Sequence, residues 1–247
     1  MKLLFPLIWT VLLLNLVACK KAEDRRCLKF SGDYAERTLP LEAFNRLDLR
    51  EHIHFVLIQD STNQLIIKGG KNLLAWVEVT QDQGLVTVSN RNRCNYLRKY
   101  AVPTVEIHVT NLINILYQGT ETCINEDTLT TNYLTLTFRD GGGSMDLNVK
   151  ALDIKAENTH GWGNLVVQGV CETFRANLMG DGAFDARKLT VTNALKIITV
   201  SSRDQWFYVQ DIPLSVQIEG IGNVRYLGHP SGIFLNKYGK GDLIDAN

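Results

Sequence analysis

The sequence predicts an all-β protein built as a parallel β-helix, a solenoid with about 20 residues per coil. The first observation is a Gly-x-Gly turn that recurs at intervals of 19 to 21 residues in the second half of the chain. The second is that apolar and polar residues alternate on both sides of each turn, as in a strand with one buried face. The third is that apolar residues recur at the same offset from the turns, with only isolated exceptions such as Gln205. Together these features are typical of stacked coils.

The first element is a secretory signal peptide over residues 1–18. Lys2 supplies a short positive region, and the apolar run that follows is too short to span a bilayer as a stable helix. The segment ends in Leu-Val-Ala-Cys, which resembles the lipobox of bacterial lipoproteins. This resemblance implies cleavage before Cys19, a diacylglycerol on its thiol, and anchoring in outer-membrane lipid. The alternative is an ordinary signal peptide followed by a chance cysteine.

Residues 19–40 are expected to form a lipidated tether and lead-in segment. Lys21-Ala22-Glu23-Asp24 resembles the acidic tag that sends some Bacteroidetes lipoproteins to the cell surface. The alternative is a solvated tether, which any lipoprotein needs. The sequence therefore predicts an outer-membrane lipoprotein, with surface exposure as a further expectation.

Four cysteines remain beyond the anchor, and none has the spacing of a zinc ligand set. An even number in an exported chain permits two disulfides, and we choose Cys27–Cys94, which would tie the N-terminal segment to the first strands. The alternative is four buried free thiols, which would include Cys123 and Cys171.

Residues 41–247 are expected to form a single elongated domain, because no Pro- or Ser-rich linker divides them. The first half of this domain reads as strands with looser spacing than the second. These strands are expected at residues 44–49, 52–58, 65–68, 72–74, 76–79, 85–88 and 105–109, with a polar loop at 91–98.

The second half is organised by the turns, whose glycines would supply the positive φ values of a sharp corner. The turns start at Gly141, Gly161, Gly180, Ser201, Gly220 and Gly239, and the fourth is a degenerate copy, Ser201/Arg203. Residues four past each start should point inward: Met145, Leu165, Phe184, Gln205, Val224 and Leu243. Residues five past each start should point outward: Asp146, Val166, Asp185, Trp206, Arg225 and Ile244. The competing fold is an antiparallel meander of hairpins, and the matched columns favour the helix.

The charge balance excludes one class of partner. Because 26 basic residues are matched by 26 acidic ones, the chain lacks the positive field of an electrostatic nucleic-acid binder. No Gly-x-Gly-x-x-Gly or Gly-x-Ser-x-Gly motif occurs in the sequence. We therefore expect no cofactor and no catalytic residue.

Four stretches of the sequence resemble one known family. They are Phe44-Asn45-Arg46-Leu47, Gly70-Lys71-Asn72-Leu73-Leu74, residues 92–98 and Gly222-Asn223-Val224-Arg225-Tyr226-Leu227-Gly228-His229-Pro230. With the repeated turns, they are similar to the head GIN-domain auto-transporter adhesins of Bacteroidetes. The resemblance implies a right-handed β-helix, a role in adhesion and no defined catalytic site. The departures are the degenerate turn at Ser201 and Arg225, which replaces a tyrosine of the family's closing signature.

Two tryptophans are candidate ligand-binding residues. Trp162 lies in a distinctive Gly-x-Gly turn, where an exposed indole could stack on a sugar ring or could instead cap the core. Trp206 lies in the outward column of the degenerate coil, because its neighbour Phe207 takes the inward position.

Two carboxylates and two histidines are the other chemical candidates. Asp146 and Asp185 share the outward column two coils apart, which places them about 10 Å from each other. Inverting glycosidases hold their carboxylates about 6.5–9.5 Å apart, so a solvated outer face is the favoured interpretation. His52 and His54 point the same way on an expected strand, but no carboxylate completes a three-ligand set, so we expect no metal site.

These observations predict a non-catalytic adhesion or ligand-binding module on an outer-membrane lipoprotein, with a glycan or protein as the unknown ligand. One alternative is a carbohydrate-active enzyme, a lyase or hydrolase, on the same scaffold. Another is a structural cell-envelope protein whose coil ends join other copies as a homo-oligomer.

Overall fold

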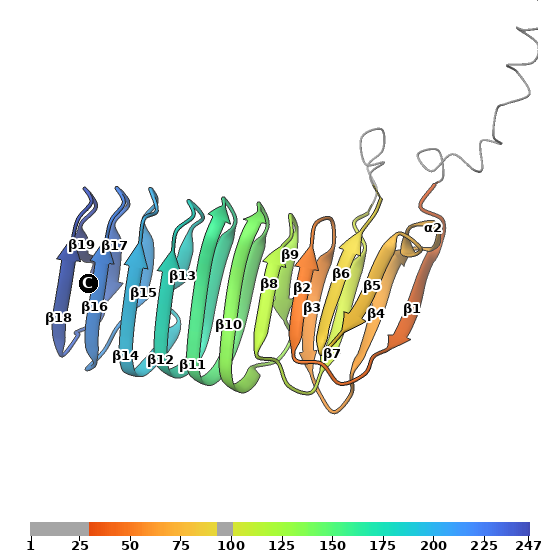
Figure 1. The fold of residues 1–247 in the computed structure, drawn as a ribbon, viewed down its shortest axis with the longest axis horizontal. Helices are drawn as coiled ribbons and strands as arrows, with labels where there is room; N and C mark the ends of the chain where they lie inside the picture. Colours follow the sequence, from red (N-terminus) through yellow and green to blue (C-terminus); the bar gives the residue numbers. More distant parts are fainter. Residues whose placement is uncertain (1–29, 93–100) are drawn as a thin grey trace, which may run out of the picture.

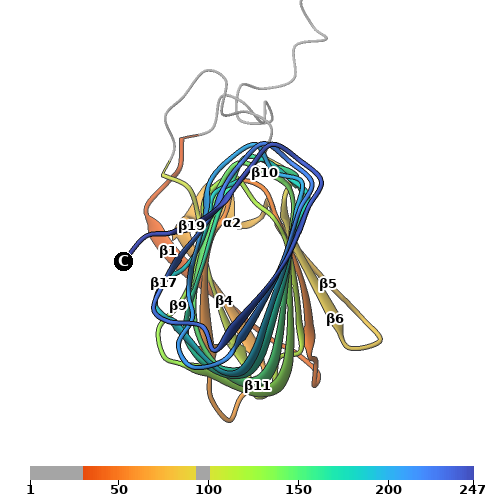
Figure 2. The same cartoon turned by 90° about the vertical axis from the view of Figure 1, so that its left-hand side faces the viewer.

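The computed structural model describes residues 30–92 and 101–247. The chain winds into stacked coils that form a long solenoid with a flattened, closed cross-section (Figures 1 and 2). Nearly all coil-to-coil contacts are parallel strand pairs, so the all-β parallel β-helix is confirmed and the antiparallel meander is wrong. β1 lies at one end of the solenoid, and β18 and β19 lie at the other (Figure 1).

One long side of the solenoid is a ladder that runs from β1 to β19. Its strands, in spatial order, are β1 (Tyr34–Pro40), β4 (Gln64–Gly70), β7 (Thr104–Val109), β3 (His54–Gln59), β9 (Thr122–Asn125), the first part of β11 (Ser144–Gly161), the first part of β12 (Asn164–Leu178), β13 (Phe184–Ala186), β15 (Gln205–Tyr208), β17 (Val224–Leu227) and β19 (Leu243–Asp245).

The opposite side is a second ladder that runs from β5 to β18. Its strands are β5 (Val77–Asp82), β6 (Leu85–Asn90), β2 (Arg46–Arg50), β8 (Asn114–Gln118), β10 (Leu129–Gly141), the later parts of β11 and β12, β14 (Leu189–Thr199), β16 (Pro213–Ile218) and β18 (Gly232–Lys237). A single continuous core between the two ladders reaches from Phe44 to Tyr226.

The N-terminal end departs from the regular coil. β1 pairs with β4, β4 with β7, and β5 with β6, all antiparallel. Residues 72–74, expected as a strand, instead belong to the short helix α2 (Lys71–Leu74), which buries Leu73 and Leu74 against this end. Strands and α2 together therefore close this end of the core.

Among the described residues, no helix is long and apolar enough to cross a membrane.

The order of the first coils in space differs from their order in the chain. The coil made by β2 and β3 lies between the coil of β6 and β7 and the coil of β8 and β9. The chain thus starts inside the stack, moves outward to build the end, and returns before continuing to the C-terminus.

The columns expected from the turns are confirmed. Asp146 pairs in register with Val166, Val166 with Asp185, and Asp185 with Trp206, and the column continues to Arg225 and Ile244. The inward column is buried from Met145 to Val224, while Leu243 in the last coil is only partly covered. Within it, the Phe184 ring is stacked between Phe174, at 5.9 Å, and Phe207, at 5.3 Å between centroids.

The turn glycines are needed for a different reason from the one expected. Among the Gly-x-Gly glycines only Gly161 has a positive φ, of 111°. The others lie against the backbone of the turn in the preceding coil: a Cβ on Gly182 would lie less than 3.0 Å from the Gly163 carbonyl oxygen, and one on Gly163 would strike the Phe138 ring and Gly143. The glycines therefore permit close stacking of turns, and the positive-φ explanation is wrong for most of them.

The degenerate turn is stabilised by a buried polar network. The Ser201 amide donates to Thr199 Oγ1, and Gln205 Nε2 donates to Ser201 Oγ at 3.0 Å and to the Arg203 carbonyl at 3.0 Å. Both Ser201 and Gln205 are fully buried. These hydrogen bonds hold the Gln205 amide nitrogen inside the degenerate turn, while Gln205 Oε1 is buried without a partner among the described residues.

Candidate functional site

The Gly-x-Gly turns line up along one edge of the solenoid (Figure 1), and Trp162 lies in the middle of the turn between Gly161 and Gly163. The neighbouring Gly163 packs against the Phe138 ring and the Gly143 carbonyl, where an added Cβ would clash. The Trp162 amide donates to the Gly141 carbonyl at 3.3 Å, which holds the turn on the preceding coil. The side chain is 73% exposed, so it does not cap the core.

Exposed apolar side chains continue from Trp162 along the same edge, one on each successive coil. Met179 and Val200 follow Leu178 and Thr199, which pair in register. Further along the edge lie Ile221, in the middle of its turn, and Tyr238, directly after β18. We call Trp162, Met179, Val200, Ile221 and Tyr238 the apolar turn ridge. The recurrence of exposed apolar side chains along one edge makes this edge a candidate interaction surface.

The sequence interpretation found Trp162 but missed the other ridge residues. A usable signal was present: Met179, Val200 and Tyr238 each immediately precede the first residue of a turn. These residues lie in or beside the turns, outside the alternating columns of the strands from which the inward and outward positions were predicted.

The two candidate carboxylates lie in the outward column, with Val166 between them. Asp146 accepts a hydrogen bond from Gln168 Nε2 at 3.2 Å. Asp185 pairs with Arg187, whose Nε lies 3.0 Å from Oδ1. Partial burial raises the pKa of Asp185, but the hydrogen bonds from Arg187 outweigh this effect and leave the pKa below its ordinary value. Asp185 is therefore held ionised, whereas a general acid needs a raised pKa.

Trp206 lies in the same outward column and is partly covered by two arginines. The guanidinium carbons of Arg187 and Arg225 lie 4.9 Å and 5.5 Å from the ring centroid. Each arginine is paired with an aspartate, Arg187 with Asp185 and Arg225 with Asp204. This arrangement gives Trp206 cation–π partners within the protein and leaves less of its ring open than in Trp162.

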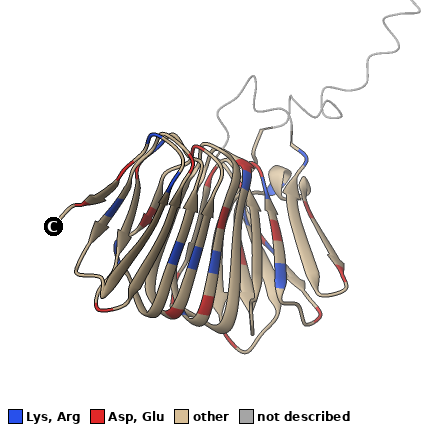
Figure 3. Cartoon of the chain, turned by 60° about the vertical axis from the view of Figure 1, so that its left-hand side comes forward, with Lys and Arg blue, Asp and Glu red and all other residues tan. Residues whose placement is uncertain are grey.

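Charges on the outer faces are mixed. Lys155, Arg175 and Lys196 lie in register on adjacent coils, and Glu157 and Asp153 pair with the first two. Figure 3 shows basic and acidic residues interspersed over the coils. The described faces thus offer no field of one sign, in agreement with the neutral composition.

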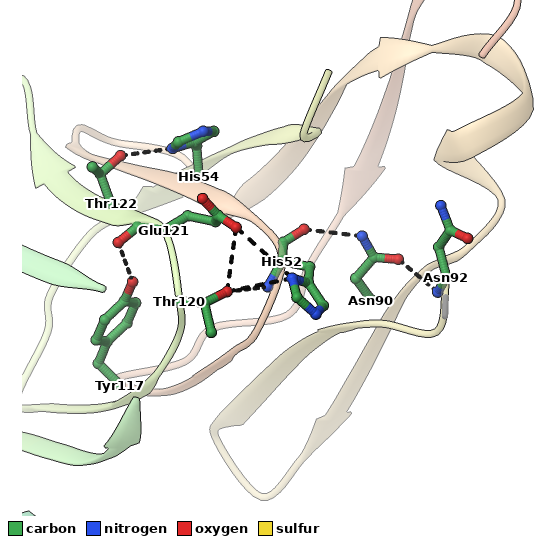
Figure 4. Close-up of polar contacts among 8 residues, drawn as sticks. All are labelled: His52, His54, Asn90, Asn92, Tyr117, Thr120, Glu121 and Thr122. Atoms are coloured by element: carbon green, nitrogen blue, oxygen red, sulfur yellow. Dashed lines mark hydrogen bonds and ion pairs between the residues drawn. The ribbon is translucent and has the colours of Figure 1, made fainter. Parts of the chain in front are cut away.

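The two histidines connect neighbouring turns (Figure 4). His52 lies in a left-handed bend with φ 62°, before β3 and not on a strand as expected. Its amide donates to Thr120 Oγ1 at 3.2 Å, and its Nδ1 lies 3.8 Å from Glu121 Oε1. His54 Nδ1 lies 2.8 Å from Thr122 Oγ1. Within residues 30–92 and 101–247, no group of three His, Cys, Asp or Glu side chains is placed to hold a metal ion.

The cysteine assignments divide in two. Cys123 and Cys171 are buried free thiols. Burial raises the pKa of Cys123, and burial followed by the nearby charge of Asp153 raises the pKa of Cys171 to about 12. Both are therefore neutral, inert core residues at physiological pH. The Cys27–Cys94 pairing and the lipid attachment at Cys19 lie outside the described residues.

The closed stack of coils, with exposed apolar side chains along its turn edge, defines the protein as a β-solenoid. The chain belongs to the family described as "Putative auto-transporter adhesin, head GIN domain", whose model matches residues 43–230. The resemblance drawn from the sequence motifs is thereby confirmed. Membership indicates an adhesin-like or binding module and suggests a place at the cell surface.

Solved structures share the fold. A putative adhesin from Bacteroides fragilis is 20% identical with a TM-score of 0.74, and the match covers 85% of this chain and 96% of that one. A putative adhesin from Parabacteroides merdae is 17% identical with a TM-score of 0.57, covering 87% and 97%. A putative lipid binding protein from Parabacteroides distasonis is 13% identical with a TM-score of 0.63, covering 87% and 98%. No curated protein matches the chain.

Proposed function

We propose that this protein is a non-catalytic adhesion module of an outer-membrane lipoprotein, and that it binds a glycan or protein ligand through the apolar turn ridge. The observation that carries the proposal is the exposure of Trp162 at the head of this ridge. Large aromatic side chains supply much contact area with little loss of conformational freedom, which is why they dominate binding surfaces. The ionised state of Asp185 and its pairing with Arg187 support a structural role for this carboxylate.

The test is a binding screen with the chain lacking its first 19 residues, immobilised and exposed to polysaccharides, matrix proteins and lipid vesicles. We expect saturable binding to one glycan or protein, and we expect Trp162→Ala to weaken it about tenfold or more. Surface plasmon resonance gives the dissociation constants. The vesicles are included because one solved structure of this fold is named a lipid binding protein.

The matched control is Tyr133→Ala, which removes another well-exposed aromatic side chain from β10, away from the ridge. This variant should bind as the unchanged protein does. Equal losses of binding affinity in Trp162→Ala and Tyr133→Ala would count against the apolar turn ridge as the binding surface. Release of sugar products that stops in Asp146→Asn or Asp185→Asn would reverse the non-catalytic assignment in favour of a carbohydrate-active enzyme.

The membrane anchor is tested separately at Cys19. We expect the Cys19→Ser variant to lose labelling by radioactive palmitate and to leave the outer-membrane fraction, because no thiol remains to carry the lipid. Fractionation of expressing cells, followed by autoradiography, measures both effects. Unchanged labelling and membrane association in Cys19→Ser would contradict lipidation at this residue.

A further inference from the structure

The C-terminal end of the solenoid is an open strand edge. Among the described strands, β18 pairs only with β16, and β19 pairs only with β17 (Figure 1). Each of these strands therefore has one side whose backbone N–H and C=O groups face outward. Exposed edges of this kind are ready to pair with another strand.

The apolar core is also open at this end. Ile233 and Leu235 continue the columns of Leu214 and Val216, which are buried. In the last coil, however, Ile233 is 45% exposed and Leu235 is 43% exposed. Leu243, which continues the column of Val224, is likewise only partly covered. We call Ile233, Leu235 and Leu243, with the free edges of β18 and β19, the C-terminal end face.

At the opposite end of the solenoid the apolar core is covered, although among the described strands β1 and β5 each keep a free edge. There Leu73 and Leu74 of α2 are buried, together with Val77. β1 pairs antiparallel beside β4, and Arg37 donates from its guanidinium to the Val77 carbonyl at 2.8 Å. The apolar C-terminal end face therefore finds no matching open core at the N-terminal end of another copy.

The charges of the last coil are balanced. Residues 232–247 contain two lysines, Lys237 and Lys240, and two aspartates, Asp242 and Asp245. Lys237 and Asp242 form an ion pair within the coil. A second copy of the same surface thus brings no excess of like charge, and it offers both signs to its counterpart.

We infer that two copies of this chain join through their C-terminal end faces, around a two-fold axis, with β18 of one copy antiparallel to β18 of the other. Backbone groups at the free edges then gain partners, and the open apolar columns of each copy cover those of the other. A two-fold contact of this type is self-complementary and closed, so it yields a dimer and not a fibre. The inference goes beyond the proposed function, because the dimer does not use Trp162.

The test uses the full chain, extracted in a non-ionic detergent, and sedimentation equilibrium corrected for bound detergent. We expect the mass of two chains. Leu235→Lys should give the mass of one chain, because it places like charges near the middle of both β18 strands. Leu235→Glu should behave in the same way, and an equimolar mixture of the two variants should recover the mass of two chains.

The matched control is Leu152→Lys, which alters a leucine of almost the same exposure, 44%, in the middle of the solenoid. It should remain a dimer. Circular dichroism and thermal unfolding verify that each variant is folded. If Leu235→Lys or Leu235→Glu does not fold, the experiment uses Ile233→Lys and Ile233→Glu in their place. The inference would be overturned by a single-chain mass for the unchanged protein. It would also be overturned if Leu235→Lys and Leu235→Glu, each measured without the other, were dimers. Loss of ligand binding in Trp162→Ala with the dimer intact bears only on the proposed function.

Discussion

Gly182→Ala is expected to lower the free energy of unfolding by about 2–3 kcal/mol, although it adds only one methyl group. A Cβ at this position would lie less than 3.0 Å from the Gly163 carbonyl oxygen of the preceding coil. That oxygen belongs to the backbone, so relief requires two stacked turns to move apart. Urea unfolding followed by circular dichroism measures the change.

The control for this prediction is Gly142→Ala in a turn two coils earlier. A Cβ on Gly142 would meet nothing within 4 Å, and its φ is not positive. The variant should therefore lie within about 0.5 kcal/mol of the unchanged protein. Similar losses of unfolding free energy at Gly182 and Gly142 would mean that the stacking of turns between coils is not the reason for glycine at these positions.

Phe184→Ala is expected to destabilise the protein by about 3–5 kcal/mol. The ring is buried and lies between Phe174 and Phe207, so its removal breaks two stacked contacts and leaves a cavity between consecutive coils. Thermal and urea unfolding check the loss. Phe184→Leu keeps most of the apolar volume and should cost less than about 1.5 kcal/mol.

The comparison for the aromatic stack is Tyr133→Ala, the same variant that controls the binding screen. Tyr133 lies on β10 and is largely exposed, so its truncation should change the unfolding free energy by no more than about 0.5 kcal/mol. If Phe184→Ala lowered the free energy of unfolding no more than Tyr133→Ala does, the phenylalanine stack would not be a main contributor to core stability.

The second half of the fold could be predicted from the sequence because each coil carries its own register marker. The offset from the Gly-x-Gly turn placed Asp146, Asp185 and Trp206 in one outward column, and the strand pairing agrees residue by residue. The repeat period predicts strand register only where coils that are consecutive in the chain are also adjacent in space. It does not report backbone conformation, and the reason given for the glycines was accordingly wrong.

The first half could be predicted only as a set of strands. Its antiparallel pairs β1–β4, β4–β7 and β5–β6, and the insertion of the β2–β3 coil between later coils, depend on contacts between distant segments. Local alternation is the same in a parallel and an antiparallel strand, so it does not distinguish them. The helical turn at Lys71–Leu74 was missed because two adjacent leucines fit either assignment.

The candidate site was partly visible in the sequence. Trp162 stood out because an indole between two glycines has no reason to be there for turn formation alone. The arginines beside Trp206 come from the coils on either side of it, at Arg187 and Arg225. Their proximity follows from the stacking of coils, which becomes visible only when the register is known.

The insertion of the β2–β3 coil into the stack has a consequence for synthesis and for evolution. Residues 46–59 precede in the chain both coils that flank them, and the second of these coils is complete only at residue 125. The N-terminal part must therefore form as one cooperative unit, whereas each later coil can add to a finished template as it emerges. We accordingly expect duplication or loss of a coil to be tolerated in the region after residue 125 and to be disruptive before it.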